Sequence, residues 1–195
     1  MRLVVFGAHT PVGRALVSQA VALGHEVQAI VRDDVEITAP PGMNVMRVRA
    51  ITADRVAMLA ADADAVLSML GPDGEPDGFA TRASSAIVEG MERAGVERLV
   101  TLGTAELCSR DLHASGDGLF RDHLGALRVL ESSTRRWTVI CPPSPSEGPA
   151  TGRYREAVEG LPAGATKIST GDVAHAALRA LGRDELVHQR LGVAL

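Results

Sequence analysis

The chain has 195 residues, of which 46% are hydrophobic and 23% are charged, so it is long enough to bury one full-sized core. Its formal net charge of -4 argues against a nucleic-acid-binding surface, because contacts with phosphates need clustered cations. There is no run of about 18 apolar residues, so we expect no membrane-spanning segment. The short apolar stretch at residues 3–6 ends at Gly7 and is typical of a first strand, not of a secretion signal.

Apolar runs of strand length alternate with segments of helical period. Strands are expected at residues 3–6, 26–31, 44–49, 64–70, 98–102, 137–141 and 191–195. Helices are expected at residues 12–23, 54–61, 79–94, 120–132 and 169–183, the last with Thr170 or Asp172 near its N-cap. This alternation predicts an α/β fold of the Rossmann type, a doubly wound parallel sheet with helices on both faces, with residues 1–195 forming a single domain.

Two segments interrupt this alternation. Residues 103–117 follow the fifth strand without clear periodicity, and residues 142–152 follow the sixth strand with four prolines and two glycines. Both leave the carboxyl ends of strands, where open α/β sheets bind their ligands. Loops of this length in a compact domain are usually functional or disordered, so we treat them as candidate parts of a site.

The turn after the first strand reads Gly7-Ala8-His9-Thr10-Pro11-Val12-Gly13. Gly7 permits a tight turn, and Gly13 lets the following helix lie close to the sheet with its amides directed at a pyrophosphate. Thr10 stands where a dinucleotide fingerprint has its middle glycine. Its hydroxyl could donate to a phosphate oxygen, although its Cβ could also hold the backbone away. We predict that this loop binds a dinucleotide.

The residues after the second strand bear on the choice of cofactor. An acidic residue there binds the ribose 2′-hydroxyl of NAD, whereas an arginine accommodates the 2′-phosphate of NADP. Arg32 is the first polar residue past the strand and favours NADP(H), and Asp33 beside it keeps NAD(H) possible.

Taken together, these segments resemble the atypical short-chain dehydrogenases of the NAD(P)H-binding, NmrA-like type, and among them the biliverdin-IXβ/flavin reductase group. The matching segments cover nearly the whole chain in order: residues 5–13, 31–33, 64–71, 95–100, 122–124, 137–143, 148–154 and 168–173. The chain departs from the family pattern at Thr10, at Ala50, where an acidic residue is usual after the third strand, and at Cys141.

The resemblance implies a reductase that uses NADPH on flavins or related small planar molecules. It also implies a set of contacts to the phosphates, from Gly7, His9, Thr10, Pro11, Val12 and Gly13, with Arg32 at the 2′-phosphate. Further along the cofactor, the implied neighbours are Leu70 and Gly71 at the adenosine ribose, Thr104 near the nicotinamide, and Pro142, Pro143 and Ser144 at the nicotinamide and substrate.

Conventional short-chain dehydrogenases use a Tyr-x-x-x-Lys pair as their proton donor. Here the only tyrosine is Tyr154 and the only lysine is Lys167, and neither lies on the helix before the sixth strand. Two other residues are candidates for a catalytic role. His123 could supply a proton near neutral pH, or it could merely cap or solvate a helix start. Thr104 could orient a carboxamide, or it could satisfy a loop amide.

Other polar residues carry weaker signals. Glu156 and Glu159 are expected to face water. Cys108 and Cys141 lack any metal-ligand spacing, and the six histidines are not paired either, so we predict no metal site. Free thiols fit a reducing compartment, and we expect a cytoplasmic protein.

Two functions remain open on the sequence. The first is an NADPH-dependent reductase of flavin-like or quinone-like acceptors. Hydride transfer to a flavin needs no dedicated protein acid, so the missing pair fits this chemistry. The second is a non-catalytic NADP(H)-binding regulator that reports redox state to a protein partner. We expect a small-molecule acceptor, no nucleic acid and no membrane, and either a monomer or a homodimer.

Overall fold

The structure is a computed structural model that describes residues 1–35, 43–71, 77–108 and 117–195. Its central feature is an eight-stranded sheet in the order β3-β2-β1-β4-β5-β6-β10-β8. The strands are β1 (Arg2–Phe6), β2 (Glu26–Arg32), β3 (Met43–Val48), β4 (Ala65–Ser68), β5 (Arg98–Leu102), β6 (Arg136–Cys141), β8 (Arg155–Val158) and β10 (Gln189–Ala194). All neighbours are parallel except β8, which runs antiparallel to β10. The first six strands follow the doubly wound order, which confirms the predicted fold class.

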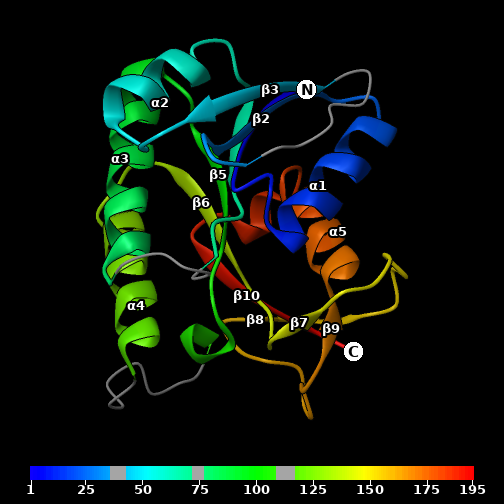
Figure 1. Cartoon of the computed structure of the whole chain (residues 1–195). Coiled ribbons are helices and arrows are strands. Elements are labelled where there is room, and N and C mark those ends of the chain that lie inside the picture. Colours follow the sequence, from blue (N-terminus) through cyan, green and yellow to red (C-terminus); the bar gives the residue numbers. More distant parts are fainter. Residues whose placement is uncertain (36–42, 72–76, 109–116) are drawn as a thin grey trace.

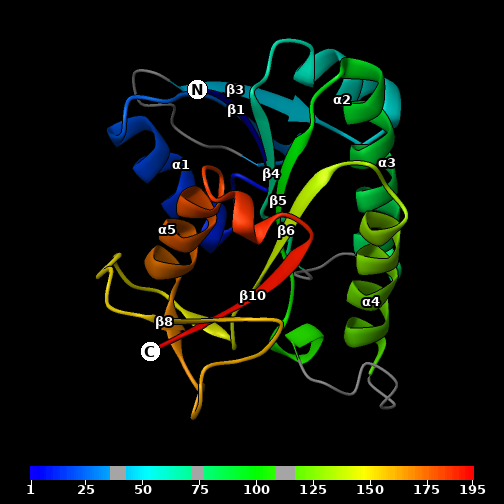
Figure 2. The same cartoon turned by 180° about the vertical axis from the view of Figure 1, so that it is seen from behind.

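Helices cover both faces of this sheet (Figures 1 and 2). Helices α2 (Ala53–Ala60), α3 (Phe79–Ala94) and α4 (Gly118–Glu131) lie on one face, and α1 (Pro11–Ala22) and α5 (Thr170–Ala180) lie on the other. A second, two-stranded sheet pairs β7 (Pro145–Ser146) with β9 (Ile168–Ser169), in the lower right part of Figure 1. Short 3-10 turns, η1 (Ala105–Cys108) and η2 (Asp184–Leu186), follow β5 and α5.

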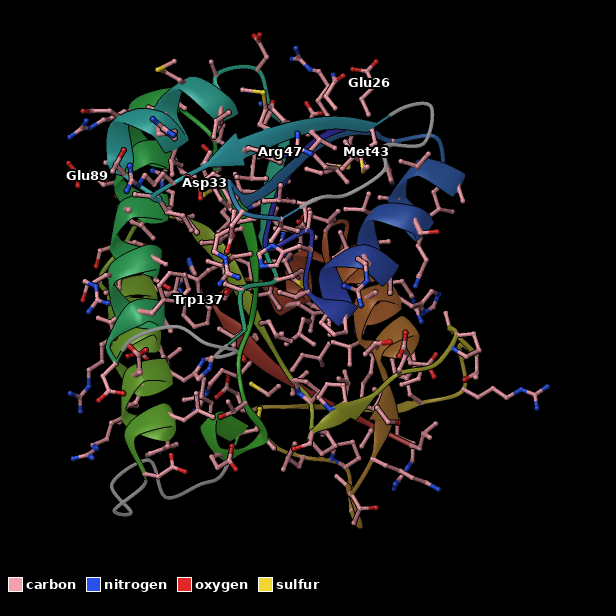
Figure 3. All side chains as sticks on the ribbon, in the orientation of Figure 1. Glu26, Asp33, Met43, Arg47, Glu89 and Trp137 are labelled. Carbon is pink, nitrogen blue, oxygen red and sulfur yellow. The ribbon has the colours of Figure 1, made fainter. Side chains whose placement is uncertain are left out.

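The strands are nearly continuous apolar runs because both of their faces are buried. On β1, Leu3 and Val5 face the core under α1 and α5, whereas Val4 and Phe6 face the core under α2, α3 and α4. Trp137 belongs to the second core, and Figure 3 shows it on the side of the sheet that α3 and α4 cover. The period of two along β1 therefore divides its side chains between two cores.

Most helix starts are capped by a side chain of the preceding residue. Thr10, Thr52, Asp117 and Ser169 each accept a hydrogen bond from an amide in the first turn of α1, α2, α4 and α5. Such caps satisfy amides that the helix itself leaves without a carbonyl. At the last helix, where Thr170 or Asp172 was expected near the N-cap, the capping residue itself is Ser169, and the Asp172 amide donates to its hydroxyl at 3.0 Å.

Helix α3 is capped from another helix instead. Its preceding residue, Gly78, offers no side chain, and the carboxylate of Asp122 on α4 accepts from the amides of Ala80 at 2.8 Å and Thr81 at 2.9 Å. Burial opposes ionisation of Asp122, but these bonds and the Thr81 hydroxyl outweigh it and lower its pKa. Asp122 thus holds α3 and α4 together, next to the candidate residue His123.

A buried arginine ties the sheet to the end of α5. The Arg98 side chain on β5 is only 6% exposed and donates to the carbonyls of Ala180 and Leu181 at the carboxyl end of α5. It also donates to the Thr138 hydroxyl at 2.8 Å. Burial, with repulsion from Arg136, lowers the pKa of Arg98 to about 10, so the guanidinium remains charged at neutral pH. A cation at this position complements the negative end of the helix dipole.

The predicted elements are all present, with ends shifted by up to three residues. The fourth strand stops at Ser68 instead of residue 70, although the amide of Met69 still donates to the Phe6 carbonyl of β1 at 2.9 Å. Strands β7, β8 and β9 were not predicted. They have two to four residues each, which is too short for a visible alternation. Residues 109–116 of the loop expected at 103–117 lie outside the described residues.

The expectation that Glu156 and Glu159 face water is confirmed for Glu159, whose side chain is 38% exposed, and is wrong for Glu156. Glu156 pairs with Arg183 at 2.6 Å, and its side chain is 23% exposed. Glu159 accepts from Arg190 at 2.8 Å. The antiparallel pairing of β8 with β10 was not predicted. It brings Glu156 on β8 and Glu159 just after it beside Arg183, which precedes η2, and Arg190 on β10.

Candidate cofactor site

The glycine loop is shaped by close contacts between backbone atoms. Gly7 has φ +72°, and a Cβ at this position would lie 2.6 Å from the Met69 carbonyl oxygen. A Cβ on Gly13 would lie 2.0 Å from the carbonyl oxygen of Gly7. Neither position can hold a larger residue without opening the loop. Helix α1 therefore begins directly against the end of β1, as the sequence predicted for a loop that presents helix amides to an anion.

Thr10 serves the loop itself. Its hydroxyl accepts from the Gly13 amide at 3.0 Å, and it lies 2.9 Å from the Gly7 carbonyl oxygen and 3.0 Å from that of Met69, either of which can take its hydrogen. With φ -67° and ψ 159° its backbone is extended, and its Cβ does not push the loop outward. The hydroxyl hydrogen is thus used within the loop. A phosphate would meet backbone amides here, with the side chain of Val12 turned into the core.

A cavity of about 80 Å³ opens beside this loop, at the carboxyl ends of β1, β2 and β3. Four of the residues that the sequence assigned to the cofactor line it: Gly7, His9, Arg32 and Leu70. Arg49 and Ala50, which follow β3, complete the wall opposite β2. The cavity lies at the strand ends where doubly wound sheets bind the adenosine half of a dinucleotide.

Two arginines therefore reach the same cavity. Arg32 is held by Asp34, with Nε 2.9 Å from the carboxylate oxygen, and Arg49 comes from the neighbouring strand. Asp33, the residue that kept NAD possible, is exposed and is not among the cavity lining (Figure 3). Arg49 was missed by the sequence reasoning because its place depends on β3 pairing with β2, where Arg32 lies opposite Val48.

A larger cavity of about 330 Å³ lies at the amino-terminal ends of β1, β2 and β3, near Arg2, Glu26 and Met43. It lies at the opposite end of β1 from the glycine loop. Since dinucleotides bind at the carboxyl ends of strands, we assign the cofactor to the smaller cavity beside the loop.

The other end of the carboxyl edge is formed by β5, β6 and α4. Thr104 follows β5, and its hydroxyl oxygen is buried without a hydrogen-bond partner in the described parts of the chain. A buried hydroxyl that lacks a partner costs about 1–3 kcal/mol. The expectation that Thr104 satisfies a loop amide therefore has no support among the described residues, and the hydroxyl suits an external polar group.

His123 points inward from α4 and is 6% exposed, so it neither caps nor solvates the helix start. It lines a cavity of about 20 Å³ together with Ser68, Ser84 and Thr101, and the wall of this cavity includes Gly103, next to Thr104. Burial lowers the pKa of His123 below 6.5, against the opposing pull of Asp122 and Glu106. The imidazole is therefore neutral at pH 7.

The loop after β6 is fixed by an aspartate on α5. The Asp172 carboxylate accepts from the amides of Thr151 at 2.7 Å and Gly152 at 2.9 Å, and from the Thr151 hydroxyl at 2.9 Å. Burial opposes its ionisation, but these bonds outweigh burial and lower its pKa. The Pro142, Pro143 and Ser144 segment thus leaves β6 as the start of an anchored loop. Asp172 was predicted only as a helix cap, since its partners lie 20 and 21 residues away.

Pro11 begins α1, and Gly71 is the last described residue after β4. Tyr154 lies on the opposite face of the sheet from α4, where its hydroxyl is 3.0 Å from His175 Nδ1 on α5.

Within the described residues, no three His, Cys, Asp or Glu side chains group as metal ligands. None of the helices described there has the length and apolar character needed to cross a bilayer.

The doubly wound sheet, the crowded glycine loop and the cavity beside it define a Rossmann-type protein built to hold a dinucleotide. Residues 7–184 match the model of the NAD(P)H-binding family. Since that match covers most of the chain, the protein belongs to this family, which confirms the resemblance.

Solved structures share the fold over the full chain. One is a candidate exported protein from Burkholderia pseudomallei, with a TM-score of 0.86 and 24% identity over 100% of both chains. Another is a candidate NADH-flavin reductase from Streptococcus pneumoniae, with a TM-score of 0.78 and 24% identity over 100% of this chain and 99% of that one. A short-chain dehydrogenase/reductase from Veillonella parvula in complex with NADP has a TM-score of 0.79 and 15% identity, covering 100% and 94%.

Proposed function

We propose that the protein is an NADPH-dependent reductase of flavin-like or quinone-like small molecules. The observation that carries the proposal is the character of α4, the helix that bears the proton-donating pair in conventional short-chain dehydrogenases. It contains neither tyrosine nor lysine, and its inward titratable side chain, His123, is buried and neutral at pH 7. A site of this kind suits an acceptor that needs no protein acid, such as a flavin.

When bound, the cofactor supplies the hydride, and the contribution of the protein is to position and shield. The amides at the start of α1 hold the pyrophosphate, because the helix dipole and the glycine loop both favour an anion there. The Thr104 hydroxyl donates to a polar group of the nicotinamide end, which satisfies a buried atom that otherwise lacks a partner. The proton that completes reduction of the acceptor comes from water.

His123 acts in this scheme as a neutral positioning group. Its ring forms part of the buried wall at the ends of β4 and β5, alongside Ser68 and Thr101. Because burial lowers its pKa, it carries no proton to give at neutral pH. We therefore expect His123→Phe to change how well the acceptor is held more than the rate of hydride transfer.

The preference for NADPH over NADH rests on the two arginines of the 80 Å³ cavity. A 2′-phosphate carries two negative charges near neutral pH, and guanidinium groups bind phosphates with paired, charge-assisted hydrogen bonds. Arg32, already oriented by Asp34, and Arg49 flank the cavity from adjacent strands. NADH offers only a hydroxyl to the same two guanidinium groups. Its binding therefore offsets less of the free energy that their desolvation costs. The NADP complex of the Veillonella relative is compatible with this choice.

The test is steady-state oxidation of NADPH by the purified protein with FMN, and separately with a small quinone. We expect continuous turnover with at least one of these acceptors and slower turnover with NADH. Tight NADPH binding without turnover of any acceptor would contradict the reductase proposal. It would favour the alternative, a regulator that binds NADP(H) and reports redox state to a partner.

The proposal includes a cytoplasmic location and a monomeric or homodimeric state. The two thiols are reduced and buried, as expected in the reducing cytoplasm. A monomer or a homodimer remains the expectation, which light scattering of the purified chain tests directly.

A further inference from the structure

Glu159, directly after β8, and Arg190 on β10 bind each other through backbone and side chain. The Glu159 amide donates to the Arg190 carbonyl at 2.8 Å, which continues the ladder that pairs Val158 with Leu191. In the other direction, the Arg190 amide donates to the Glu159 carboxylate at 2.7 Å. The Arg190 guanidinium donates to the same carboxylate, with its Nε at 2.8 Å. A single carboxylate thus holds both the backbone and the side chain of Arg190.

The backbone of Glu159 is strained to make this contact. Its φ is +54°, in the left-handed region that residues other than glycine rarely adopt. The carboxylate there accepts the Arg190 amide that a continued antiparallel ladder would give to a carbonyl. A glycine would adopt this conformation without strain, but it has no carboxylate. Strain of this kind persists only where surrounding contacts enforce it, so the contact with Arg190 outweighs it.

Arg190 also reaches η1. On β10, Leu191 and Val193 face the core under α1 and α5, so the Arg190 side chain leaves the strand on the opposite face of the sheet. Its Nη1 donates there to the carbonyl of Leu107, a residue of η1 that is only 1% exposed. A guanidinium carries donors along several edges, so Arg190 binds the carboxylate and the carbonyl at the same time.

The turn that Arg190 holds begins next to Thr104. The Leu107 amide donates to the Thr104 carbonyl at 3.1 Å, and the Gly103 amide donates to the Ile140 carbonyl on β6 at 2.8 Å. Thr104 therefore lies between two fixed points, β6 through Gly103 and β10 through Leu107. Its hydroxyl, buried without a hydrogen-bond partner in the parts of the chain that the structure describes, is placed by these two contacts.

We propose that Glu159 and Arg190 are positioning residues of the cofactor site, which hold η1 on β10 and thereby aim the Thr104 hydroxyl at the nicotinamide end. The inference rests on the proposed function, which puts Thr104 at that end of the cofactor. Loss of the Glu159–Arg190 pair should release η1 without undoing the sheet, because β10 stays paired with β6 and β8. Only the nicotinamide end of the cofactor should then bind less well.

The experiment is titration calorimetry of Arg190→Lys with NADPH and with adenosine 2′,5′-bisphosphate, a fragment that contains only the adenosine end. An ammonium group can pair with Glu159 but lacks the planar set of donors that also reaches Leu107. We expect NADPH to bind about fivefold more weakly, the effect of one lost hydrogen bond, and the fragment to bind as tightly as before. Equal losses for the two ligands, or no loss for either, would overturn the proposal.

Arg183→Lys is the matched control. Arg183 pairs with Glu156 on β8 at 2.6 Å and is about as buried as Arg190, but among the described residues it makes no hydrogen bond to η1. It should leave the affinity for both ligands unchanged. In a Thr104→Val background, Arg190→Lys should cause no further loss of NADPH affinity, because Arg190 acts through Thr104. Additive losses would contradict this route.

A second measurement needs no ligand. The Leu107 amide should exchange its hydrogen about tenfold faster in Arg190→Lys than in the wild-type chain, and at the wild-type rate in Arg183→Lys. An unchanged exchange rate in Arg190→Lys would overturn the inference by itself. A wild-type chain that binds NADPH without turnover would contradict the reductase proposal instead, and neither the affinities nor the exchange rates depend on turnover.

Discussion

The two ends of the carboxyl edge are built by different means. At the β1–α1 end, the site is formed by backbone atoms. Gly7 and Gly13 permit backbone contacts that a larger residue would prevent, and the Thr10 hydroxyl accepts a hydrogen bond from the Gly13 amide. At the β5–β6 end, the site is formed by side chains from segments far apart in the sequence, such as Thr104 and His123. The first end is rigid and suits an invariant pyrophosphate, whereas the second can vary with the acceptor. The proposed function therefore puts cofactor binding and hydride transfer on separate parts of one sheet.

The largest effect is expected from a methyl group in the glycine loop. Gly13→Ala places a Cβ 2.0 Å from the Gly7 carbonyl oxygen, so the start of α1 must move away from β1. We expect a loss of roughly 2–3 kcal/mol of folding stability and at least ~100-fold in NADPH affinity. Urea unfolding and calorimetry measure the two. Gly118→Ala is the matched control, since a Cβ there meets nothing within 4 Å. Equal stability and equal NADPH affinity of the two variants would contradict the account of a crowded loop.

The second effect concerns the anchored loop of the nicotinamide end. Asp172→Asn replaces a carboxylate that accepts from two amides and one hydroxyl, which should cost about 2 kcal/mol of folding stability. Because the folded state lowers the pKa of Asp172, the wild-type contribution is complete above the ordinary value of 3.8 and is lost as pH falls through the folded pKa. Unfolding measured across this acid range should show a flatter pH dependence in the variant.

Asp62→Asn is the control for that experiment, because the Asp62 side chain is 85% exposed and pairs only loosely with Arg2. It should leave both the stability and its pH dependence unchanged. A wild-type acid transition that Asp172→Asn does not alter would show that this carboxylate is not the anchor.

A third effect sharpens the difference between the two cofactors at the adenosine end. Arg49→Ala removes one of the two cations of the cavity, and we expect NADPH affinity to fall about tenfold, or ~1.4 kcal/mol, with little change for NADH. Arg47→Ala is the control from the same strand, since Arg47 is exposed on β3 and does not line the cavity (Figure 3). Equal losses for NADPH and NADH would mean that Arg49 does not contact the 2′-phosphate.

The smallest effect is expected at Thr104. Thr104→Val removes a hydroxyl without a protein partner in the described residues, so folding stability should not fall. Cofactor binding should weaken by about 1 kcal/mol, roughly fivefold, and Thr104→Ser should restore it. Thr138→Val makes the contrast, because the Thr138 hydroxyl bonds to Leu186 and Arg98 and its loss should lower stability instead. A Thr104→Val variant with unchanged affinity would remove Thr104 from the site.

These two ends also differ in how far the sequence predicts them. The glycine loop lies within seven consecutive residues, so its geometry follows from local rules about turns and helix starts. The strands and helices were likewise predicted from the apolar period, to within three residues at each end. Arg49 could not be assigned, because it approaches Arg32 only once β3 pairs with β2 in its observed register.

Long-range contacts account for the remaining errors. Glu156 was expected in water because β8 is only four residues long, and its pairing with β10 could not be read from so short a segment. The anchoring role of Asp172 likewise joins segments 20 or more residues apart. In each case the residue was visible in the sequence, but its partner was set by tertiary packing.

The central claim is that the edge formed by β1, β2 and β3 binds NADPH through the glycine loop and two arginines. Its most direct test is titration calorimetry of the wild-type chain with NADPH and with NADH under the same conditions. The account predicts one site per chain and NADPH affinity at least about tenfold higher, the contribution of a charge-assisted phosphate contact. Equal affinity for the two cofactors, or no binding of either, would contradict it.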